Sequence, residues 1–228
     1  MPADSAPTSS RQFWDAAARE NAAWYVATGY TSETPEFFAQ GARETDHFLQ
    51  FCGIGIRPTD RVLEIGCGVG RMTRRLSELA GSLVAADVSR EMLERARQNV
   101  GDRGTVEYLL VPGNGALPLS DDSVDVVFSY ITLQHVPNQV DQLRYLHESA
   151  RVLRPGGRLA VQVRGDTPRA IALDWLGHLR HLLRGRQTLR PEWRGSRLSD
   201  AAIAGAFDYS AGLKVCRLGA RHRWVILG

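Results

Sequence analysis

The chain has 228 residues, of which 43% are hydrophobic, and a formal net charge of +3. This length suits one large domain or a domain with a cap, and so mild a charge does not by itself indicate a nucleic-acid-binding protein. Three scattered cysteines form neither a disulfide framework nor a zinc spacing, and no apolar run approaches the roughly 18 residues of a membrane span. The first residues carry no signal pattern, so we expect a cytoplasmic protein with a disordered tail over residues 1–9.

Helical spacing predicts two helices in the next part of the chain, which we expect to form a helical cap over residues 10–58. Aromatic residues crowd the first helix and the loop after it: Phe13, Trp14, Trp24, Tyr25 and Tyr30. Such side chains either pack a cap onto its domain or face a ligand. We expect Tyr25 and Tyr30 to face a cleft, with Gly29 as the hinge of a mobile lid.

From residue 59 onward, strand and helix patterns alternate. The predicted strands lie at 61–65, 82–87, 105–110, 123–129 and 158–163, and the predicted helices at 70–80, 89–100 and 138–153. A Pro-Gly breaker, "RPGG", ends the last of these helices. Alternation with nearly continuous apolar strands indicates an α/β fold, in which an open parallel sheet carries helices on both faces. Such sheets bind ligands at the carboxyl ends of their strands.

The stretch "VLEIGCGVGRMT" places three glycines at alternate positions directly after the first strand. Glycines permit backbone dihedral angles that other residues avoid, and they let a ligand approach the main chain. The dinucleotide fingerprint G-x-G-x-x-G is broken, because Arg71 stands where the third glycine belongs. A tight strand-to-helix turn without a ligand is the alternative interpretation of this stretch.

An acidic residue, Asp87, ends the second strand about 20 residues after the glycines. A carboxylate at this place can accept hydrogen bonds from both hydroxyls of a ribose. Its alternative role is to cap the helix that follows. Because Ser89 is the better N-cap, the sequence favours the ribose interpretation.

Four segments together resemble class I S-adenosylmethionine-dependent methyltransferases of the small-molecule type. They are "VLEIGCGVGRMT", "AADVSREMLERAR", "GNGALPLSDDSVDVVFSYITLQHVPN" and "ARVLRPGGRLAVQV", in the family's order and spacing over about residues 60–165. The resemblance implies a Rossmann-like, mostly parallel sheet of seven strands with a reversed C-terminal hairpin, for which residues 213–228 are the candidate. The methyltransferase core would then span 59–228, with a helical insertion at about 166–197.

The same resemblance implies where S-adenosyl-L-methionine binds. Glu64, Gly66 and Gly68 would shape the pocket for the methionine part of the cofactor, and Asp87 would hold the ribose. The cofactor-binding residues expected in this way are Glu64, Gly66, Cys67, Gly68, Arg71, Asp87, Val88, Met92, Asn114, Gly115 and Ser129.

The remaining members of this set have more specific expected roles. Val88 and Met92 would lie against the adenine, and Ser129 would line the path of the transferred methyl group. Asn114 stands where the family usually has an aspartate that meets the adenine amino group, but an amide oxygen can still accept from that amine. Arg71 would either meet the cofactor carboxylate or lie in solvent in the first turn of a helix.

Methyl transfer mainly requires that a nucleophile be held in line with the sulfonium methyl group and that water be excluded. A general base helps when the nucleophile is a hydroxyl or a protonated amine, and His135 is the candidate for this role. Its alternative role is packing, because "QHVP" looks like a recurrent loop element of the family that lies beneath the cofactor. The sequence carries no motif for a metal site or a nucleophilic triad.

Substrate choice is expected to come from the cap and the insertion. The insertion carries a run of arginines: Arg184, Arg186, Arg190, Arg194 and Arg197. Such a run could receive an acidic substrate or RNA, but it is more often a solvated loop, and only Trp193 adds an aromatic ring to it.

We therefore expect a small-molecule methyl acceptor, reacting at an O, N or C atom, in bacterial secondary metabolism, with neither a membrane nor a nucleic-acid partner. Three alternatives stay open: an S-adenosylmethionine-binding protein without transferase activity, an RNA-modifying methyltransferase and, with less support, an NAD-dependent oxidoreductase. The sequence leaves the oligomeric state open.

Overall fold

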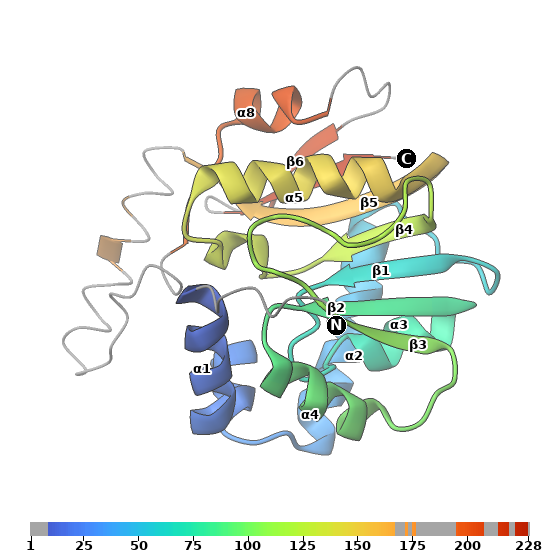
Figure 1. Cartoon of the computed structure of the whole chain (residues 1–228), viewed down its shortest axis with the longest axis vertical. Helices are drawn as coiled ribbons and strands as arrows, with labels where there is room; N and C mark the ends of the chain where they lie inside the picture. The colour runs from blue at the N-terminus through green and yellow to red at the C-terminus, as the bar shows by residue number, and fades with distance from the viewer. Residues whose placement is uncertain are drawn as a thin grey trace, which may run out of the picture.

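The computed structural model describes residues 9–166, 172, 175–176, 195–207, 214–218 and 222–227 (Figure 1). The helices are α1 (Ser9–Val26), α2 (Pro35–Cys52), α3 (Thr73–Leu79), α4 (Arg90–Val100), η1 (Leu133–His135), α5 (Gln139–Val152) and α8 (Asp200–Gly205). The strands are β1 (Arg61–Ile65), β2 (Ser82–Asp87), β3 (Val106–Leu110), β4 (Val124–Ser129), β5 (Leu153–Arg164), β6 (Lys214–Leu218) and β7 (His222–Leu227). The expected tail up to residue 8 and most of the expected insertion lie outside the described residues.

The strands form one mixed sheet in the order β3-β2-β1-β4-β5-β7-β6. The first five of these pair in parallel, whereas β7 runs antiparallel to both β5 and β6. The predicted α/β fold, with a mostly parallel sheet and a reversed strand at its C-terminal end, is confirmed. Strand order reverses between β1 and β4, so a ligand is expected at the carboxyl ends of these two strands.

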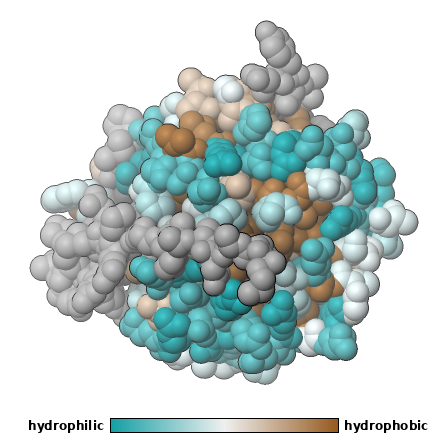
Figure 2. Space-filling model, viewed as in Figure 1, coloured by the Kyte–Doolittle hydropathy of each residue, from teal (hydrophilic) through white to brown (hydrophobic). Residues whose placement is uncertain are grey.

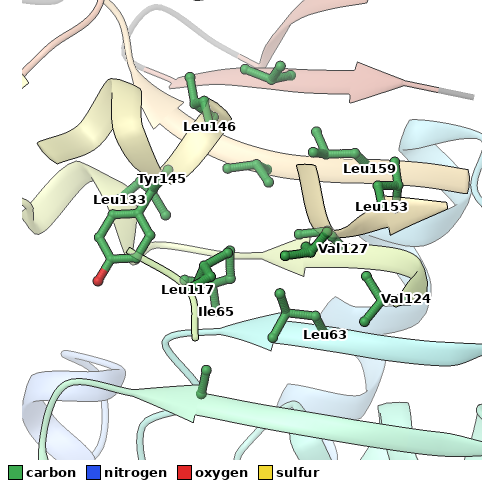
Figure 3. Packing of buried hydrophobic residues seen from close by; sticks show 14 of the residues in the cluster. Leu63, Ile65, Leu117, Val124, Val127, Leu133, Tyr145, Leu146, Leu153 and Leu159 are labelled. Atoms are coloured by element: carbon green, nitrogen blue, oxygen red, sulfur yellow. The ribbon is translucent and has the colours of Figure 1, made fainter. Parts of the chain in front are cut away.

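Successive strand residues point to opposite faces of the sheet, and each face is covered by helices. One face packs against α5 and α8. Leu63, Val127 and Leu159 from three strands lie there in one cluster with Leu146 of α5 (Figure 3). The other face packs against α2, α3 and α4. Both layers bury apolar side chains from every central strand, which explains why the strand segments read as nearly continuous apolar runs.

Short-range signals set the helix starts. Thr34, Ser89 and Asn138 are the N-caps of α2, α4 and α5, and each side chain accepts a hydrogen bond from a backbone N–H of the first turn. Two boundaries differ from expectation. The helix after β1 begins at Thr73 rather than at residue 70. β5 begins at Leu153, before "RPGG", and the sheet accommodates these residues by a shift of register between β4 and β5.

The N-terminal helix α1 stands at the end of the sheet toward which β1 and β4 point (Figure 1). It ends at Val26 and contains one non-helical residue, Asn21, with φ −166° and ψ 84°. The Asn21 side chain accepts from Trp24 N at 3.0 Å and donates to Thr31 O at 3.2 Å. α1 is therefore broken at Asn21, where the side chain of that residue holds the break, and the expected hinge Gly29 lies beyond the end of the helix.

The outer surface matches this layered core. Figure 2 shows a largely hydrophilic face with hydrophobic groups reaching the surface near its middle. Within the described parts of the chain, we find no helix with the length and apolar character needed to cross a bilayer.

Candidate functional site

A cavity lies at the carboxyl ends of the central strands, with α1 as one of its walls. Its floor comes from the glycine loop after β1 and from Asp87 and Val88 at the end of β2. Residues 130–132, which follow β4, and His135 of η1 form another side, and Trp14 and Tyr25 of α1 face them. The cavity therefore forms at the switch point where the fold predicts a ligand.

Three different neighbours explain the three glycines of the loop. A Cβ atom at Gly66 would lie 2.1 Å from the Thr132 side chain, and one at Gly70 would lie 2.9 Å from a methyl group of Val100 in α4. A Cβ atom at Gly68, where φ is +53°, would lie 3.0 Å from Val26 at the end of α1. The loop thus approaches the post-β4 segment, α4 and the N-terminal helix at once, and two of these neighbours are walls of the cavity.

Asp87 lies in the cavity floor with both carboxylate oxygens engaged. Gly68 N donates to Oδ2 and Ser89 N donates to Oδ1, each at 2.9 Å. Burial raises the pKa of Asp87 to about 6, although the backbone donors lower it. The group is therefore mainly ionised at pH 7, and each oxygen keeps a lone pair for a further donor.

Glu64 is a second buried carboxylate in the lining, at the end of β1. Burial raises its pKa to about 7, and the hydrogen bond from Thr73 Oγ1 at 2.7 Å acts against this rise. Next to it, burial raises the pKa of the Cys67 thiol, so that the thiol is a neutral part of the wall. Two acids thus lie in one cavity at a cost in folding free energy, as expected of a functional site.

Burial of the ionised Glu64 carboxylate lowers the stability of the folded protein, which leads to a prediction for the Glu64→Gln variant. The folded pKa of about 7 lies above the ordinary value of 4.5, so the folded state favours the protonated acid. The contribution of Glu64 to the free energy of unfolding of the wild type is therefore largest at low pH and is lost as the pH rises through 7. We expect the variant to be more stable than the wild type at pH 8, by on the order of 3 kcal/mol, with little difference at pH 4. Urea unfolding at both values measures this.

The matched control for this prediction is Glu148→Gln. Arg151 lowers the pKa of Glu148, through a hydrogen bond of 2.7 Å. Replacing this acid should therefore destabilise the protein at pH 8. A Glu64 variant that behaves like the Glu148 variant would show that Glu64 is stabilised by partners rather than strained by burial.

Arg71 is buried in the cavity wall, with only 5% of its surface exposed, so the solvent-exposed alternative is wrong. One guanidinium nitrogen binds Glu44 Oε2 of α2 at 2.5 Å, and the group lies 5.7 Å from the centre of the Phe37 ring. The other terminal nitrogen, Nη1, is buried without a hydrogen-bond partner among the described residues. An orphaned buried donor in a cavity wall is the arrangement expected where an anionic ligand group binds.

His135 of η1 lines the cavity beside the segment that follows β4. Its ring makes an edge contact with Trp14 of α1, with 5.5 Å between ring centroids, and its Nε2 lies 3.2 Å from Gln134 Nε2. The imidazole thus contacts α1, and it is accessible from the cavity. His135 can therefore pack against Trp14 and still contact a ligand in the cavity.

The structure brings most of the predicted set together and leaves four members outside the cavity. The lining includes Glu64, Gly66, Cys67, Gly68, Arg71, Asp87, Val88, Met92, His135 and Tyr25. Asn114 is exposed, and its Oδ1 accepts from Ala116 N within its own turn. Gly115 packs instead against Asp141 O, where a Cβ atom would lie 2.5 Å away. Val111 and Gly113 line the cavity in their place.

The other two members outside the cavity lining are a buried hydroxyl and an aromatic ring. Ser129 is fully buried, and its Oγ donates to Ile65 O at 2.9 Å, so it ties β4 to β1. Tyr30 packs edge-on against Phe37, with 5.3 Å between centroids, in the interface of α1 and α2. Neither residue belongs to the cavity lining.

Sequence reasoning missed Ile131, which lines the cavity directly after β4. Its φ of +55° is unusual for a β-branched residue, and its backbone N–H is held by Gln162 Oε1 at 3.2 Å. Backbone strain of this kind concentrates at functional sites. No single-residue signal in the sequence reports it, because it depends on a buried glutamine of β5.

The polar contacts of α1 with the site were also missed. Asp15 Oδ1 accepts from Ser89 Oγ at 2.6 Å, and Arg11 donates to Val88 O and Val111 O at 3.2 and 3.3 Å. These contacts place α1 over the residues that follow β2 and β3. Within the described residues, no group of three or more His, Cys, Asp or Glu side chains could hold a metal ion.

Comparison with known proteins identifies the central part of this fold. Residues 63–161, which contain the glycine loop, Asp87 and the post-β4 segment, match the family model described as a methyltransferase domain. The chain carries a methyltransferase domain. The resemblance to S-adenosylmethionine-dependent methyltransferases seen in the sequence is thereby confirmed, and this family uses S-adenosylmethionine as its cofactor.

Two curated relatives illustrate the methyltransferase likeness. The probable methyltransferase ltbC of Aspergillus luteorubrus is 33% identical over 169 residues, covering 67% of this chain and 58% of the relative. The 27-O-demethylrifamycin SV methyltransferase of Amycolatopsis mediterranei is 38% identical over 112 residues, covering 46% of this chain and 39% of the relative. The chain thus matches about half of these relatives' own length.

A solved structure extends the likeness of the fold over nearly the whole chain. It is the magnesium protoporphyrin IX methyltransferase of Synechocystis PCC 6803 with bound SAH, with a TM-score of 0.62 and 17% identity. The match covers 95% of this chain and 96% of that one. At this identity the likeness concerns the fold.

Proposed function

We propose that the protein is an S-adenosylmethionine-dependent methyltransferase that acts on an O, N or C atom of a small molecule. The observation that carries the proposal is that two buried charged groups line the same cavity. One is the Asp87 carboxylate, and the other is the Arg71 guanidinium, whose Nη1 has no hydrogen-bond partner among the described residues. The first complements hydroxyl groups and the second complements a carboxylate. S-adenosylmethionine carries a ribose at one end and an amino-acid carboxylate at the other.

The bound cofactor supplies an electrophilic methyl group, and the protein holds and orients it. Asp87 accepts from the ribose hydroxyls, while Arg71 Nη1 donates to the carboxylate of the methionine part. Val88 and Met92 offer apolar contact to the adenine. Glu64, whose pKa is about 7, lies where it can accept from the amino group of the same ligand.

On the acceptor side, His135 is the candidate for the proton of a hydroxyl or protonated amine. Tyr130 also lines the cavity, but burial raises its pKa to about 12, so it stays protonated and cannot act as a base at neutral pH. A small-molecule acceptor is supported by the name of the rifamycin relative and by a lining in which Trp14 and Tyr25 are prominent.

Calorimetric titration tests the proposal against its alternatives. S-adenosylhomocysteine should bind, and NADH should not. Turnover is then measured with S-adenosylmethionine labelled in its methyl group and a panel of phenols, enols and amines. Binding of NADH alone would favour an oxidoreductase. Binding of S-adenosylhomocysteine with no turnover across the panel would favour a non-catalytic cofactor-binding protein, and transfer to RNA would favour the nucleic-acid alternative.

We further propose that α1 is a lid, with Tyr25 facing the ligand and Asp15 as one of its polar attachments, to the Ser89 hydroxyl and to Glu91 N. This helix forms one wall of the cavity, and methyl transfer needs water to be excluded from the bound cofactor.

The lid predicts a specific pattern of hydrogen exchange. Amides of residues 10–26 should exchange more slowly when S-adenosylhomocysteine is added, and Asp15→Ala should make them exchange roughly tenfold faster in the free protein. Asp46→Ala is the control, because it removes an ion pair of 2.8 Å with Arg75 on the side of α2. Slow exchange that responds neither to ligand nor to the variant would make α1 a fixed part of the fold.

A further inference from the structure

The chain segment 195–198, which leads out of the expected insertion, lies directly against the η1 turn. Gly195 has φ +56°, and a Cβ atom there would lie 1.7 Å from Gln134 O. Only a residue without a side chain permits this approach of two backbones. The turn so contacted is the one that brings His135 to the cavity.

Two polar side chains connect this segment to both ends of the turn. Ser196 Oγ lies 2.9 Å from Val136 O and 2.9 Å from Gln142 Oε1, and its single proton can serve either acceptor. Gln142 is fully buried in α5, and its Nε2 donates to Leu133 O at 2.6 Å. The pair therefore holds the carbonyl groups of the residues that begin and follow η1.

The segment is anchored independently of the turn. Leu198 N donates to Arg164 O at 2.9 Å, and Leu198 forms an isolated bridge with Gly165 at the end of β5. Gln139 Nε2 donates to Arg197 O at 2.7 Å, which adds a contact with the start of α5. Because the segment is attached to the sheet, it can act as a fixed support for the η1 turn.

We propose that Ser196 and Gln142 are positioning residues of this site. They set the position of His135, and of Val136 and Pro137 in the cavity lining, by holding the η1 turn against the segment 195–198. The inference rests on the proposed function in one respect, since the position of His135 bears on catalysis only if the cavity performs methyl transfer. The positioning itself can be measured without an acceptor.

Nuclear magnetic resonance of histidine side chains tests the proposal. The ring of Trp14 lies 5.5 Å from that of His135, so a displacement of η1 changes the ring-current shift of the His135 Hε1 proton. In Ser196→Ala this resonance should shift while those of His47, His147 and His222 do not. S-adenosylhomocysteine affinity should fall by roughly twofold to tenfold, as expected for one hydrogen bond. Ser196→Thr, which keeps the hydroxyl, should restore both.

The matched control is Ser123→Ala. Ser123 Oγ donates to a backbone carbonyl, Ser120 O, at 2.7 Å, but it lies at the opposite end of β4. Its loss should leave the His135 resonance and the affinity unchanged. Gly195→Ala should shift the His135 resonance further than Ser196→Ala, because its new methyl group would collide with Gln134 O. Ser196→Cys replaces the alanine variant if that variant does not fold.

The outcomes separate this inference from the proposed function. A His135 resonance that stays in place in Ser196→Ala and Gly195→Ala, in a protein that binds S-adenosylhomocysteine, overturns the positioning role alone. A wild type that does not bind S-adenosylhomocysteine overturns the proposed function, whereas the response of His135 to Ser196→Ala would still support the positioning role.

Discussion

Replacing Arg71 with methionine is expected to weaken the binding of S-adenosylhomocysteine by about 30- to 1,000-fold, or about 2–4 kcal/mol, because a buried charged donor and its carboxylate partner are separated. The same variant should bind 5′-methylthioadenosine as the wild type does, since this ligand has no amino-acid part. Methionine keeps most of the side-chain length, and the released Glu44 remains 26% exposed and can be hydrated, which limits the loss of stability. Calorimetry with both ligands measures the difference.

The control for this experiment is Arg74→Met. Arg74 lies on α3 with its guanidinium 4.8 Å from the centre of the Phe38 ring, so it contacts α2 as Arg71 does, but it lies outside the cavity lining. Both ligands should bind this variant normally. If Arg71→Met weakens the two ligands equally, Arg71 supports α2 and does not meet the carboxylate.

The Asp87→Ala variant should show the complementary pattern, with both ligands weakened by roughly 10- to 150-fold, or about 1.5–3 kcal/mol. Both ligands carry the ribose, and the variant removes the acceptor of its hydroxyl groups. Backbone donors Gly68 N and Ser89 N also lose their partner, so the glycine loop becomes less well ordered.

Asp87 should also make the ligand affinity of the wild type depend on pH. Its pKa is raised to about 6, and the ribose binds the ionised form, so protonation competes with the ligand. Affinity for 5′-methylthioadenosine should therefore fall about tenfold per pH unit below pH 6, and the alanine variant should lack this fall. Asp125→Ala is the control, because Asp125 accepts from Arg61 N at 2.8 Å at the opposite end of the sheet. An unchanged affinity in Asp87→Ala would remove Asp87 from the site.

Much of the core fold could be predicted because its signals are local. The apolar runs of β1 and β2, the N-cap Ser89 and the glycine loop each depend on residues adjacent in the sequence. Asp87 could be placed at the cavity for the same reason, since a residue that ends a buried parallel strand must lie at the carboxyl edge of the sheet. The family resemblance then followed from the order of these segments.

Three of the expected site residues that lie outside the cavity lining have side chains held by other partners. Asn114 turns to its own backbone, and Ser129 bonds to a carbonyl of β1, a strand 64 residues earlier in the chain. Tyr30 packs on Phe37 only because α1 and α2 meet. For Ser129 and Tyr30 the residue type permitted the predicted role, but the side chain makes a contact that local sequence does not encode.

The sequence by itself determined the alternation of strands and helices, the glycine loop and the acid at the end of β2, because these depend on hydrophobic periodicity and on short-range capping. Only the tertiary structure decided that Arg71 is buried with an unpartnered nitrogen, that α1 covers the residues after β2 and β3, and that Ser196 supports the turn of His135. These features arise where residues 27 to 100 positions apart come into contact, and their partners are chosen by packing and by the need to pair buried polar groups.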